Sequence, residues 1–289
     1  MVVNNSTPIT IDQGHTDHIM LMSDLHLLSS NCNTKAIKAD LELARANNAR
    51  ILINGDVFDF ILPGDAKRFA LSATRDVGMR NDLINAAVDE AVKLLQPYGD
   101  LLDVVGMGNH ETHVEKKHSV DAISLLVGRL RAEGSSVEHG DICGWYRRRY
   151  LYSKSKTKSW TLRLFRHHGV GASSPTTKGI GDFSRMLTYV DGSVDIMWLG
   201  HKHNRFVDTM ERHGMKMNGT PYVRSTLCVM TGSYLNLHPQ QTSSDILSRG
   251  RKSNYASEVN MAPQTKGGIL IGVRPNDDGS LSLSAHLNI

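Results

Sequence analysis

Short apolar runs that alternate with helix-like segments constrain the fold of this chain more than any other feature. Three runs typical of buried strands cover residues 18–22, 50–54 and 101–105. Three segments with apolar side chains at helical spacing cover residues 34–49, 79–95 and 119–132. Asn33 or Thr34 is a suitable N-terminal cap for the first of these helices. The rhythm predicts a mostly parallel sheet with helices on both faces.

The last third of the chain has a different pattern. Four further runs typical of strands cover residues 205–210, 222–231, 268–273 and 281–287. They predict a second, more antiparallel sheet that packs on the first. The chain has 289 residues, 40% of them hydrophobic, and no linker long enough to divide it. We therefore expect a single domain over residues 1–289, with the core motifs in 18–204 and the strands and loops of the second sheet in 205–289.

Composition excludes several classes of protein. No apolar run reaches the ~18 residues of a membrane span, and the N-terminal residues lack the basic start and apolar core of a secretory signal. Cys32, Cys143 and Cys228 are scattered and form neither a disulfide framework nor a zinc knuckle. These features predict a cytoplasmic protein without a membrane partner. The formal net charge of +4 is compatible with an anionic substrate.

Polar motifs that contain metal-binding groups stand at five expected strand ends: after the three runs above, after the stretch W-T-L-R-L-F at 160–165 and after the apolar run 194–199. They are S-D-L-H-L with Asp24 and His26, N-G-D-V-F-D with Asp56 and Asp59, G-N-H-E with Asn109, His110 and Glu111, R-H-H-G with His167 and His168, and G-H-K-H with His201 and His203. Each motif alone is a common turn or a chance pair. Together they supply carboxylate, imidazole and amide groups at the carboxyl ends of strands, where open α/β sheets bind ligands. Such groups suit first-row metals, so the sequence predicts a metal centre.

In this order, the five motifs resemble the signature of the calcineurin-like metallophosphoesterases: D-x-H, G-D-x-x-D, G-N-H-E, a single histidine and G-H-x-H. The resemblance extends from Asp24 to His203. It implies an α/β fold of two packed mixed β-sheets flanked by helices, a four-layer sandwich. It also implies a dinuclear metal-dependent phosphoesterase that hydrolyses phosphodiester or phosphomonoester bonds with a metal-bound hydroxide. Manganese is the first choice for the two divalent metal ions, and iron, zinc and nickel are alternatives.

The resemblance also assigns roles to residues. One ion would bind Asp24, His26, Asp56 and His203, and the other would bind Asp56, Asn109, His168 and His201. Asp56 would thus bridge the two ions. His168 directly precedes Gly169, whereas His167 fits a second pattern of the family, so both stay candidates, with His168 favoured.

Two catalytic roles and two departures from the family follow from the same motifs. His110 would be a general acid or a phosphate orienter, and Asp59 would pair with it. Serine/threonine phosphoprotein phosphatases carry arginine directly after G-D-x-x-D, where this chain has Phe60. Lipid A precursor pyrophosphatases replace the histidine of the third motif with arginine, whereas this chain keeps His110. Both departures argue against those classes and leave a small phosphoester as the expected substrate.

Two alternatives remain open. The first is a nuclease that acts on DNA, because residues 144–166 predict a hairpin with interleaved basic and aromatic side chains. Alternation places Tyr146, Arg148, Tyr150 and Tyr152 on one face, and the tip carries Lys154, Lys156 and Lys158. A solvated edge hairpin is the simpler interpretation, and the basic segment 248–255 is likewise typical of a solvated loop. The second alternative is a non-catalytic scaffold with this fold, although such proteins typically lose motif residues that are all present here.

Overall fold

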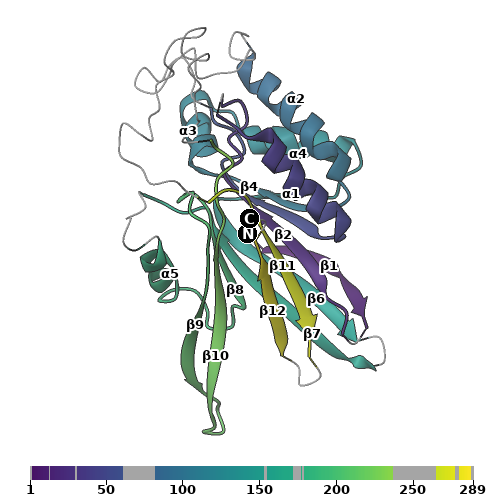
Figure 1. Cartoon of the computed structure of the whole chain (residues 1–289), viewed down its shortest axis with the longest axis vertical. Helices are drawn as coiled ribbons and strands as arrows, with labels where there is room; N and C mark the ends of the chain where they lie inside the picture. Colours follow the sequence, from purple (N-terminus) through teal and green to yellow (C-terminus); the bar gives the residue numbers. More distant parts are fainter. Residues whose placement is uncertain are drawn as a thin grey trace, which may run out of the picture.

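Two six-stranded mixed sheets pack face to face and carry the helices on their outer sides (Figure 1). This computed structural model describes residues 2–12, 14–29, 31–60, 82–152, 155–171, 177, 179–236, 265–276 and 280–287, apart from the side chains of 2–7 and 152–158. The expected fold class, two packed mixed sheets flanked by helices, is confirmed.

The first sheet contains the strands that the sequence pattern marks most clearly. Its order is β12 (Leu281–His286), β11 (Ile269–Pro275), β2 (Asp17–Met22), β3 (Arg50–Asn54), β4 (Leu102–Gly106) and β5 (Glu138–Gly140). Strands β2 to β5 are parallel, whereas β11 and β12 run antiparallel.

Helices cover one face of this sheet, and the second sheet covers the other. The covering helices are α1 (Thr34–Ala46), α2 (Leu83–Leu95) and α4 (Ala122–Ala132), with the 3-10 turn η3 (Gln96–Tyr98) after α2. Along β2, Met20 and Met22 pack with the helices, whereas Ile19 and Leu21 pack against the second sheet. The expectation of helices on both faces was therefore wrong, because an apolar run shows that both faces are buried but not what covers each.

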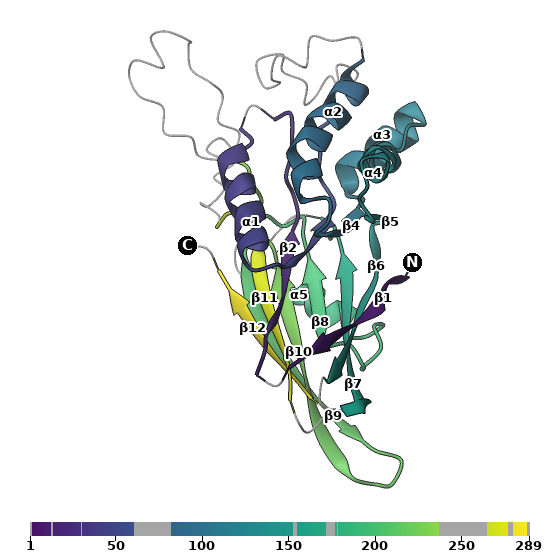
Figure 2. The ribbon, with the colours of Figure 1, turned by 90° about the vertical axis from the view of Figure 1, so that its right-hand side faces the viewer.

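The second sheet is assembled from distant parts of the chain. Its order is β1 (Val2–Ile11), β6 (Cys143–Tyr152), β7 (Ser155–His167), β8 (Ile196–Leu199), β10 (Pro221–Met230) and β9 (Phe206–Met215). Helix α5 (Ile180–Met186) packs on its outer face through Phe183. The sequence predicted that the strands after residue 205 would form one separate sheet, and this was wrong. Strands β9 and β10 join the second sheet, whereas β11 and β12 join the first. Figure 2 shows the β9–β10 hairpin extending beyond the other strands.

The aromatic face of the β6–β7 hairpin lies in the protein interior. Strand β1 covers the outer side of β6, so the hairpin is not at an edge of the sheet. Tyr146, Arg148 and Tyr150 are buried between the two sheets, where they bind the carboxylates of Asp17 and Asp103. This face is therefore not available to stack on bases. The side chains of Tyr152, Lys154, Lys156 and Lys158 and the segment 248–255 lie outside the described residues.

Two further differences concern helices. The expected helix over 119–132 begins at Ala122, after Asp121 accepts a hydrogen bond from the Ser124 backbone at 2.8 Å. An additional helix, α3 (Asn109–His118), starts inside the G-N-H-E motif, which the sequence pattern had marked as a turn. Within the described residues, the helices are too short or too polar to cross a membrane.

Candidate metal centre

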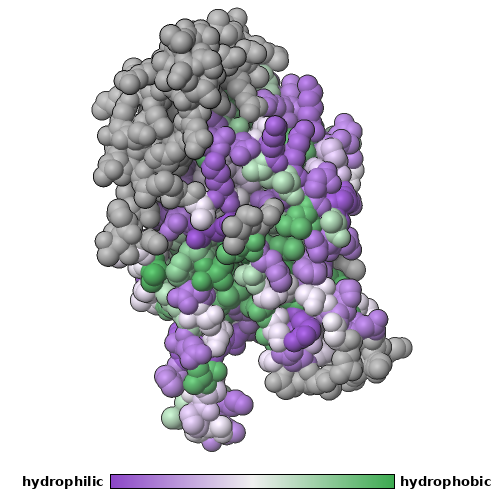
Figure 3. Space-filling model, viewed as in Figure 1, coloured by the Kyte–Doolittle hydropathy of each residue, from purple (hydrophilic) through white to green (hydrophobic). Residues whose placement is uncertain are grey.

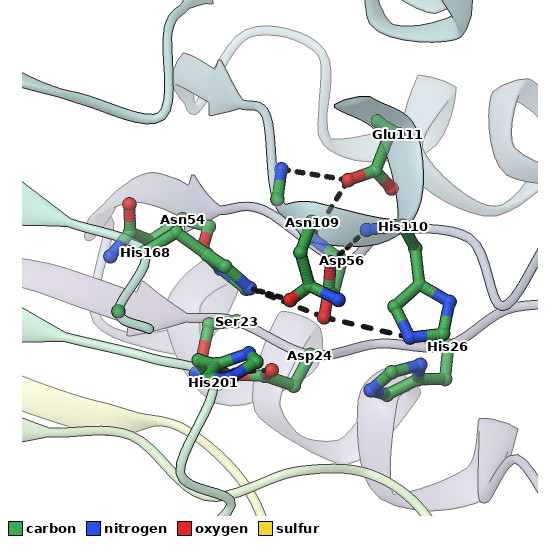
Figure 4. A network of polar contacts seen from close by, with 12 residues as sticks. Ser23, Asp24, His26, Asn54, Asp56, Asn109, His110, Glu111, His168 and His201 are labelled. Carbon is green, nitrogen blue, oxygen red and sulfur yellow. Dashed lines mark hydrogen bonds and ion pairs between the residues drawn. The ribbon is translucent and has the colours of Figure 1, made fainter. Parts of the chain in front are cut away.

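The five motifs meet at one edge of the two sheets (Figure 4). Strand β3 is the centre of this edge, because the Asn54 side chain donates a hydrogen bond to the His167 carbonyl of the other sheet at 2.9 Å. The loop after β2 pairs with the loop after β3, since the backbone N–H of Asp24 donates to the Gly55 carbonyl at 3.0 Å. The loop after β8 is joined to the loop after β7 in the same way, because the backbone N–H of Gly200 donates to the His168 carbonyl at 3.0 Å. Side chains that lie far apart in the sequence are thus held within contact of one another.

One group of possible metal ligands consists of Asp24, His26 and His203. The Nε2 atoms of the two histidines are 3.2 Å apart, and His203 Nε2 is 3.3 Å from Asp24 Oδ1. His26 Nδ1 lies 3.1 Å from Asp59 Oδ1, and this carboxylate accepts the Nδ1 proton. The lone pair of His26 Nε2 therefore points at the space shared with the other two side chains.

A second group consists of Asp56, His168 and His201. His168 Nε2 is 3.2 Å from Asp56 Oδ2 and 3.1 Å from Asn109 Oδ1. His168 Nδ1 donates to the Asn54 carbonyl at 2.7 Å, which again leaves Nε2 facing the carboxylate. We call the two groups and Asn109 together the strand-end cluster.

The donor chemistry of the strand-end cluster fits divalent cations. Each group offers a carboxylate and two imidazoles whose ligand atoms all lie within 4.8 Å of one another. In both groups a hydrogen bond at Nδ1 orients one imidazole, an arrangement typical of histidines that bind metals. Mixed nitrogen and oxygen donors suit manganese, iron, nickel or zinc better than magnesium or calcium.

The electrostatics of the second group also favour a cation. Burial raises the pKa of Asp56, but the charge of His168 outweighs this and lowers the pKa overall. Burial lowers the pKa of His168, but Asp56 raises it to about 10. Burial and the charge of His168 lower the pKa of His201 to about 4. The buried Asp56 carboxylate thus favours the protonated, positively charged form of His168. A bound cation would replace the proton of His168.

Backbone conformation is unusual at the cluster. Asp24, His26, Asp56, His201 and His203 all have positive φ angles, between 47° and 64°. Residues other than glycine rarely adopt this left-handed region, and each instance costs about 1–3 kcal/mol. Such strain concentrates at functional sites, where the surrounding structure holds it in place.

Glu111 holds these strained loops together. Its carboxylate accepts hydrogen bonds from the backbone N–H groups of Asp56 at 3.0 Å, Phe58 at 3.0 Å and Gly108 at 2.8 Å. Burial and the neighbouring Asp56 raise the pKa of Glu111 to about 7. Glu111 is thus a clamp between the loops after β3 and β4. A glutamate at the third position of a helix, after Gly108, was the sequence signal for this capping role.

Gly108 allows the two loops to approach so closely. A Cβ atom at this position would lie 2.1 Å from Asp56 Oδ1. Any other residue there would displace the carboxylate at the centre of the cluster.

His110 lies beside the cluster at the start of α3. Its Nδ1 is 2.6 Å from the backbone carbonyl of Asp59, which accepts the Nδ1 proton, and its Nε2 is 4.0 Å from Asp56 Oδ2. The Asp59 carboxylate is 3.9 Å from His110 but 3.1 Å from His26. The expected pairing between Asp59 and His110 therefore runs through the backbone of Asp59, and its carboxylate orients His26 instead. Burial lowers the pKa of His110, but Asp56 and Asp59 raise it overall.

The two adjacent histidines of the fourth motif have different surroundings. His168 lies within the cluster, whereas His167 Nδ1 accepts a hydrogen bond from the Gly169 backbone at 2.8 Å. Burial also lowers the pKa of His167 below its usual value. Of the two, only His168 faces Asp56.

Lys202 ties the last motif to neighbouring segments, a role that the sequence did not indicate. The side chain is buried, and its Nζ donates to the Val170 carbonyl at 2.5 Å and to the Gly171 carbonyl at 2.9 Å. It also forms an ion pair with Asp182 of α5 at 3.2 Å. These contacts connect the loop between His201 and His203 to the segment after His168.

Comparisons with known proteins identify no family for this chain. Neither the family models nor the curated proteins contain a match to this chain. Among solved structures, the chain is similar to the crystal structure of Vps29 from Chaetomium thermophilum, with 10% sequence identity over 93% of this chain and 94% of that one and a TM-score of 0.35. A likeness with this TM-score carries no argument about the fold or the activity. The described residues form a sandwich of two mixed sheets with outer helices, the architecture expected from the sequence.

Proposed function

We propose that this protein is a metal-dependent phosphoesterase, a hydrolase that acts on phosphoric ester bonds. The observation that carries the proposal is the pair of adjacent ligand groups, each of which brings three ligand atoms within 4.8 Å at the edge where both sheets end. A cluster that served stability alone would have its lone pairs filled by hydrogen-bond donors. Here the Nε2 atoms of His26 and His203 face each other at 3.2 Å, and the Nε2 atom of His168 faces the Asp56 carboxylate at 3.2 Å.

The proposal assigns the two ions to overlapping sets of residues. One ion would bind Asp24, His26, Asp56 and His203, and the other would bind Asp56, Asn109, His168 and His201. Asp56 is the shared carboxylate in this assignment, supported by its contact with His168 and by its central place in Figure 4. Two bound divalent ions would acidify a water molecule and neutralise phosphoryl oxygens. Manganese is our first choice, and iron, zinc or nickel suit the same donors.

The chain's own residues position the substrate and handle the leaving group. The carbonyl of Asp59 accepts the Nδ1 proton of His110 at 2.6 Å, so Nε2 is the nitrogen turned toward the cluster. With 18% of its side chain exposed, His110 can reach a substrate at the edge of the cluster. We assign it the protonation of the leaving ester oxygen, for which general acids contribute about 10²–10⁴-fold.

A small phosphoester is the substrate that we favour over nucleic acid. The nuclease alternative drew its support from the aromatic face of the β6–β7 hairpin, and Tyr146 and Tyr150 of that face are buried. DNA is therefore included in the assay as the alternative.

The test is metal reconstitution. Metal-stripped protein is loaded with manganese, iron, zinc or nickel and assayed on an aryl phosphomonoester, an aryl phosphodiester and single-stranded DNA. We expect hydrolysis of an aryl ester that saturates at two metal ions per chain. Tight binding of two ions without turnover of any substrate would instead support the non-catalytic scaffold.

A matched pair of variants tests the ligand assignment. His168→Asn removes an imidazole of the cluster, whereas His167→Asn changes its sequence neighbour outside the cluster. We expect metal content and activity to fall in the first variant and to stay near wild-type values in the second. The reverse result would show that His167 is the ligand.

A further inference from the structure

Strand β9 forms one edge of the second sheet, as β1 does on the opposite side. It has 10 residues and pairs with β10 along its whole length, from Met215 opposite Pro221 to Phe206 opposite Met230. Strands of about 5–6 residues are more usual. On its other side, β9 has no neighbouring strand within the part of the chain that the structure describes. Figures 1 and 2 show the β9–β10 hairpin as an arm that projects from the body.

The register identifies which backbone groups point outward from this edge. Next to the hairpin turn, the N–H of Lys216 donates to the Thr220 carbonyl at 2.9 Å. Bonded and non-bonded pairs alternate along antiparallel strands, so the even-numbered residues of β9 bond to β10. Proline has no N–H, and Pro221 correspondingly faces the odd-numbered Met215. The outward N–H and C=O groups therefore belong to Val207, Thr209, Glu211 and His213, and of these the Thr209 N–H donates to the Asp208 side chain at 2.8 Å.

The arm also carries exposed apolar side chains. Met215 is 71% exposed, Met217 is fully exposed, and Tyr222 and Val223 are also exposed. Figure 3 shows the arm as the projection at the lower left, where apolar residues lie among hydrophilic ones. Large apolar side chains gathered on a projecting edge are typical of a surface that another protein covers.

We propose that β9 pairs antiparallel with β9 of a second copy of this chain, around a two-fold axis that passes through Met210. In this register Asp208 faces Arg212 of the partner subunit, and the symmetry repeats the pair. Within one chain Asp208 accepts from the Thr209 N–H and Arg212 donates to Thr226 Oγ1 at 3.3 Å, and pairing would replace these contacts. Thr209 faces Glu211 of the partner subunit, and both residues have outward backbone groups, so they form bonded pairs. The pairing joins the second sheets of the two subunits into one continuous sheet.

Charge selects this register over its neighbours. An axis through Glu211 would place the two copies of Glu211 directly opposite each other, which is unfavourable. An axis through Thr209 would place Asp208 opposite Met210 and Arg212 opposite Phe206, and would leave both charges without a partner on the facing strand. The axis through Met210 gives each of these two charges an opposite charge.

The same register explains the exposed apolar tip. Met215 lies opposite Arg205 of the partner subunit, two residues after that subunit's own copy of the last metal-binding motif. The apolar side chains around Met217 would therefore pack on the partner beside its strand-end cluster. Each arm would help to enclose the other subunit's site.

Light scattering of the full chain tests the pairing. We expect the wild-type protein to be a dimer at about 50 µM. Thr209→Pro removes an outward N–H from each copy without disturbing the β9–β10 ladder, and we expect it to weaken association on the order of 100-fold. Glu133→Arg, an exposed charge reversal at the end of α4 on the other side of the molecule, is the matched control and should stay dimeric.

Charge reversal tests the register. Asp208→Arg or Arg212→Asp alone replaces both attractive pairs with like charges, and each should raise the dissociation constant about tenfold. The double variant Asp208→Arg/Arg212→Asp recreates opposite charges across the axis and should restore dimerisation. Circular dichroism melting of each variant shows whether the fold is intact.

Cysteine cross-linking tests the axis directly. Met210→Cys places two thiols across a pair whose Cα atoms lie about 4.5 Å apart, a separation that a disulfide can span. We expect mild oxidation to cross-link this variant with itself. Asp208→Cys alone should not cross-link, but it should do so when mixed with Arg212→Cys. The wild-type protein is the control, because its Cys32 and Cys228 are buried and Cys143 is half-buried.

Three results would overturn the proposal. They are a monomeric wild-type protein at 50 µM, a dimer that Thr209→Pro and the single charge reversals leave unchanged, and a folded Met210→Cys variant that does not cross-link. None of them depends on enzymatic activity.

Discussion

Two buried polar clusters in this protein use similar side chains in opposite ways. Between the sheets, Asp17 accepts hydrogen bonds from Arg148 Nε at 2.6 Å and from the Tyr150 hydroxyl at 2.9 Å. In the same region, Asp103 accepts from the Tyr146 hydroxyl at 2.7 Å and from Arg50 Nε at 2.8 Å. We call these six residues the inter-sheet network. Its carboxylates face N–H and O–H donors, so the protein alone satisfies them.

The carboxylates of the strand-end cluster have different neighbours. Asp24 accepts from the Ser23 hydroxyl and the His201 backbone, and Asp56 accepts from the His110 backbone. In addition, the two carboxylates face ring nitrogens of His203 and His168, respectively. Because His168 and His26 are oriented through Nδ1, their Nε2 atoms act as donors only while they carry an additional proton.

Titration behaviour separates the two clusters further. Burial and the neighbouring carboxylates raise the pKa of Tyr146 and of Tyr150 far above the usual range, so the inter-sheet network keeps its protons. In the strand-end cluster the pKa of His168 is raised to about 10 while that of His201 falls to about 4. The inter-sheet network stabilises the fold, whereas the strand-end cluster groups carboxylates with imidazoles that could hold a cation. The following experiments test this distinction.

Loss of the shared carboxylate should have the largest effect. Asp56→Ala removes the group assigned to both ions, and we expect activity to fall about 10³-fold or more, because each ion contributes several kcal/mol. Elemental analysis should show that both ions are lost. Asp103→Ala in the inter-sheet network is the counterpart, and it should lower stability but keep the metal. Metal loss in Asp103→Ala would break the comparison.

Loss of the general acid should come next. His110→Asn should keep both ions and the fold, because His110 is not assigned as a ligand. We expect a loss of about 10²-fold on an alkyl phosphodiester and a smaller loss on an aryl phosphodiester, whose leaving group needs no proton. Steady-state kinetics on the two esters measure the difference. Equal losses would show that His110 orients the phosphate instead.

Removal of the carboxylate that orients His26 should have an intermediate effect. Asp59→Ala leaves His26 Nδ1 without its acceptor, and we expect metal affinity to fall about 10–100-fold. Asp59→Asn keeps an acceptor oxygen and should fall less. Calorimetric titration with manganese compares the two variants. If both bind metal as the wild type does, the hydrogen bond between Asp59 and His26 has no part in ligand orientation.

The smallest effect is expected from a single deletion in the inter-sheet network. Tyr150→Phe removes one donor to Asp17 but leaves the two hydrogen bonds from Arg148. We expect the free energy of unfolding to fall by about 1 kcal/mol, with metal content and kinetics unchanged. Denaturant unfolding measures the first and the aryl ester assay the second. A clear loss of activity would mean that the network also supports the site.

Much of the site was predictable from the sequence, because its signals are local. The run of residues 50–54 is β3, and polar motifs at the ends of parallel strands must meet at one edge. The types of candidate ligand followed from the motifs, and the structure brings Asp24, His26 and His203 together as one possible metal-binding group.

Tertiary structure decided what lies next to each of these elements. Alternation showed that Tyr146 and Tyr150 share a face, but the pairing of β1 with β6 and the packing of the two sheets decided that this face is buried. The position of β11 beside β2 depends on a contact between residues about 250 positions apart, which no local pattern encodes.

The same reason explains the finer points of the site. His167 and His168 are neighbouring residues of the same type, and the direction in which β7 ends decided that His168 reaches Asp56. The Asp59 carboxylate orients His26 rather than His110 because of how three separate loops fold over one another. Sequence periodicity determined which side chains share a face and which chemistry they bring, whereas long-range packing decided which groups touch.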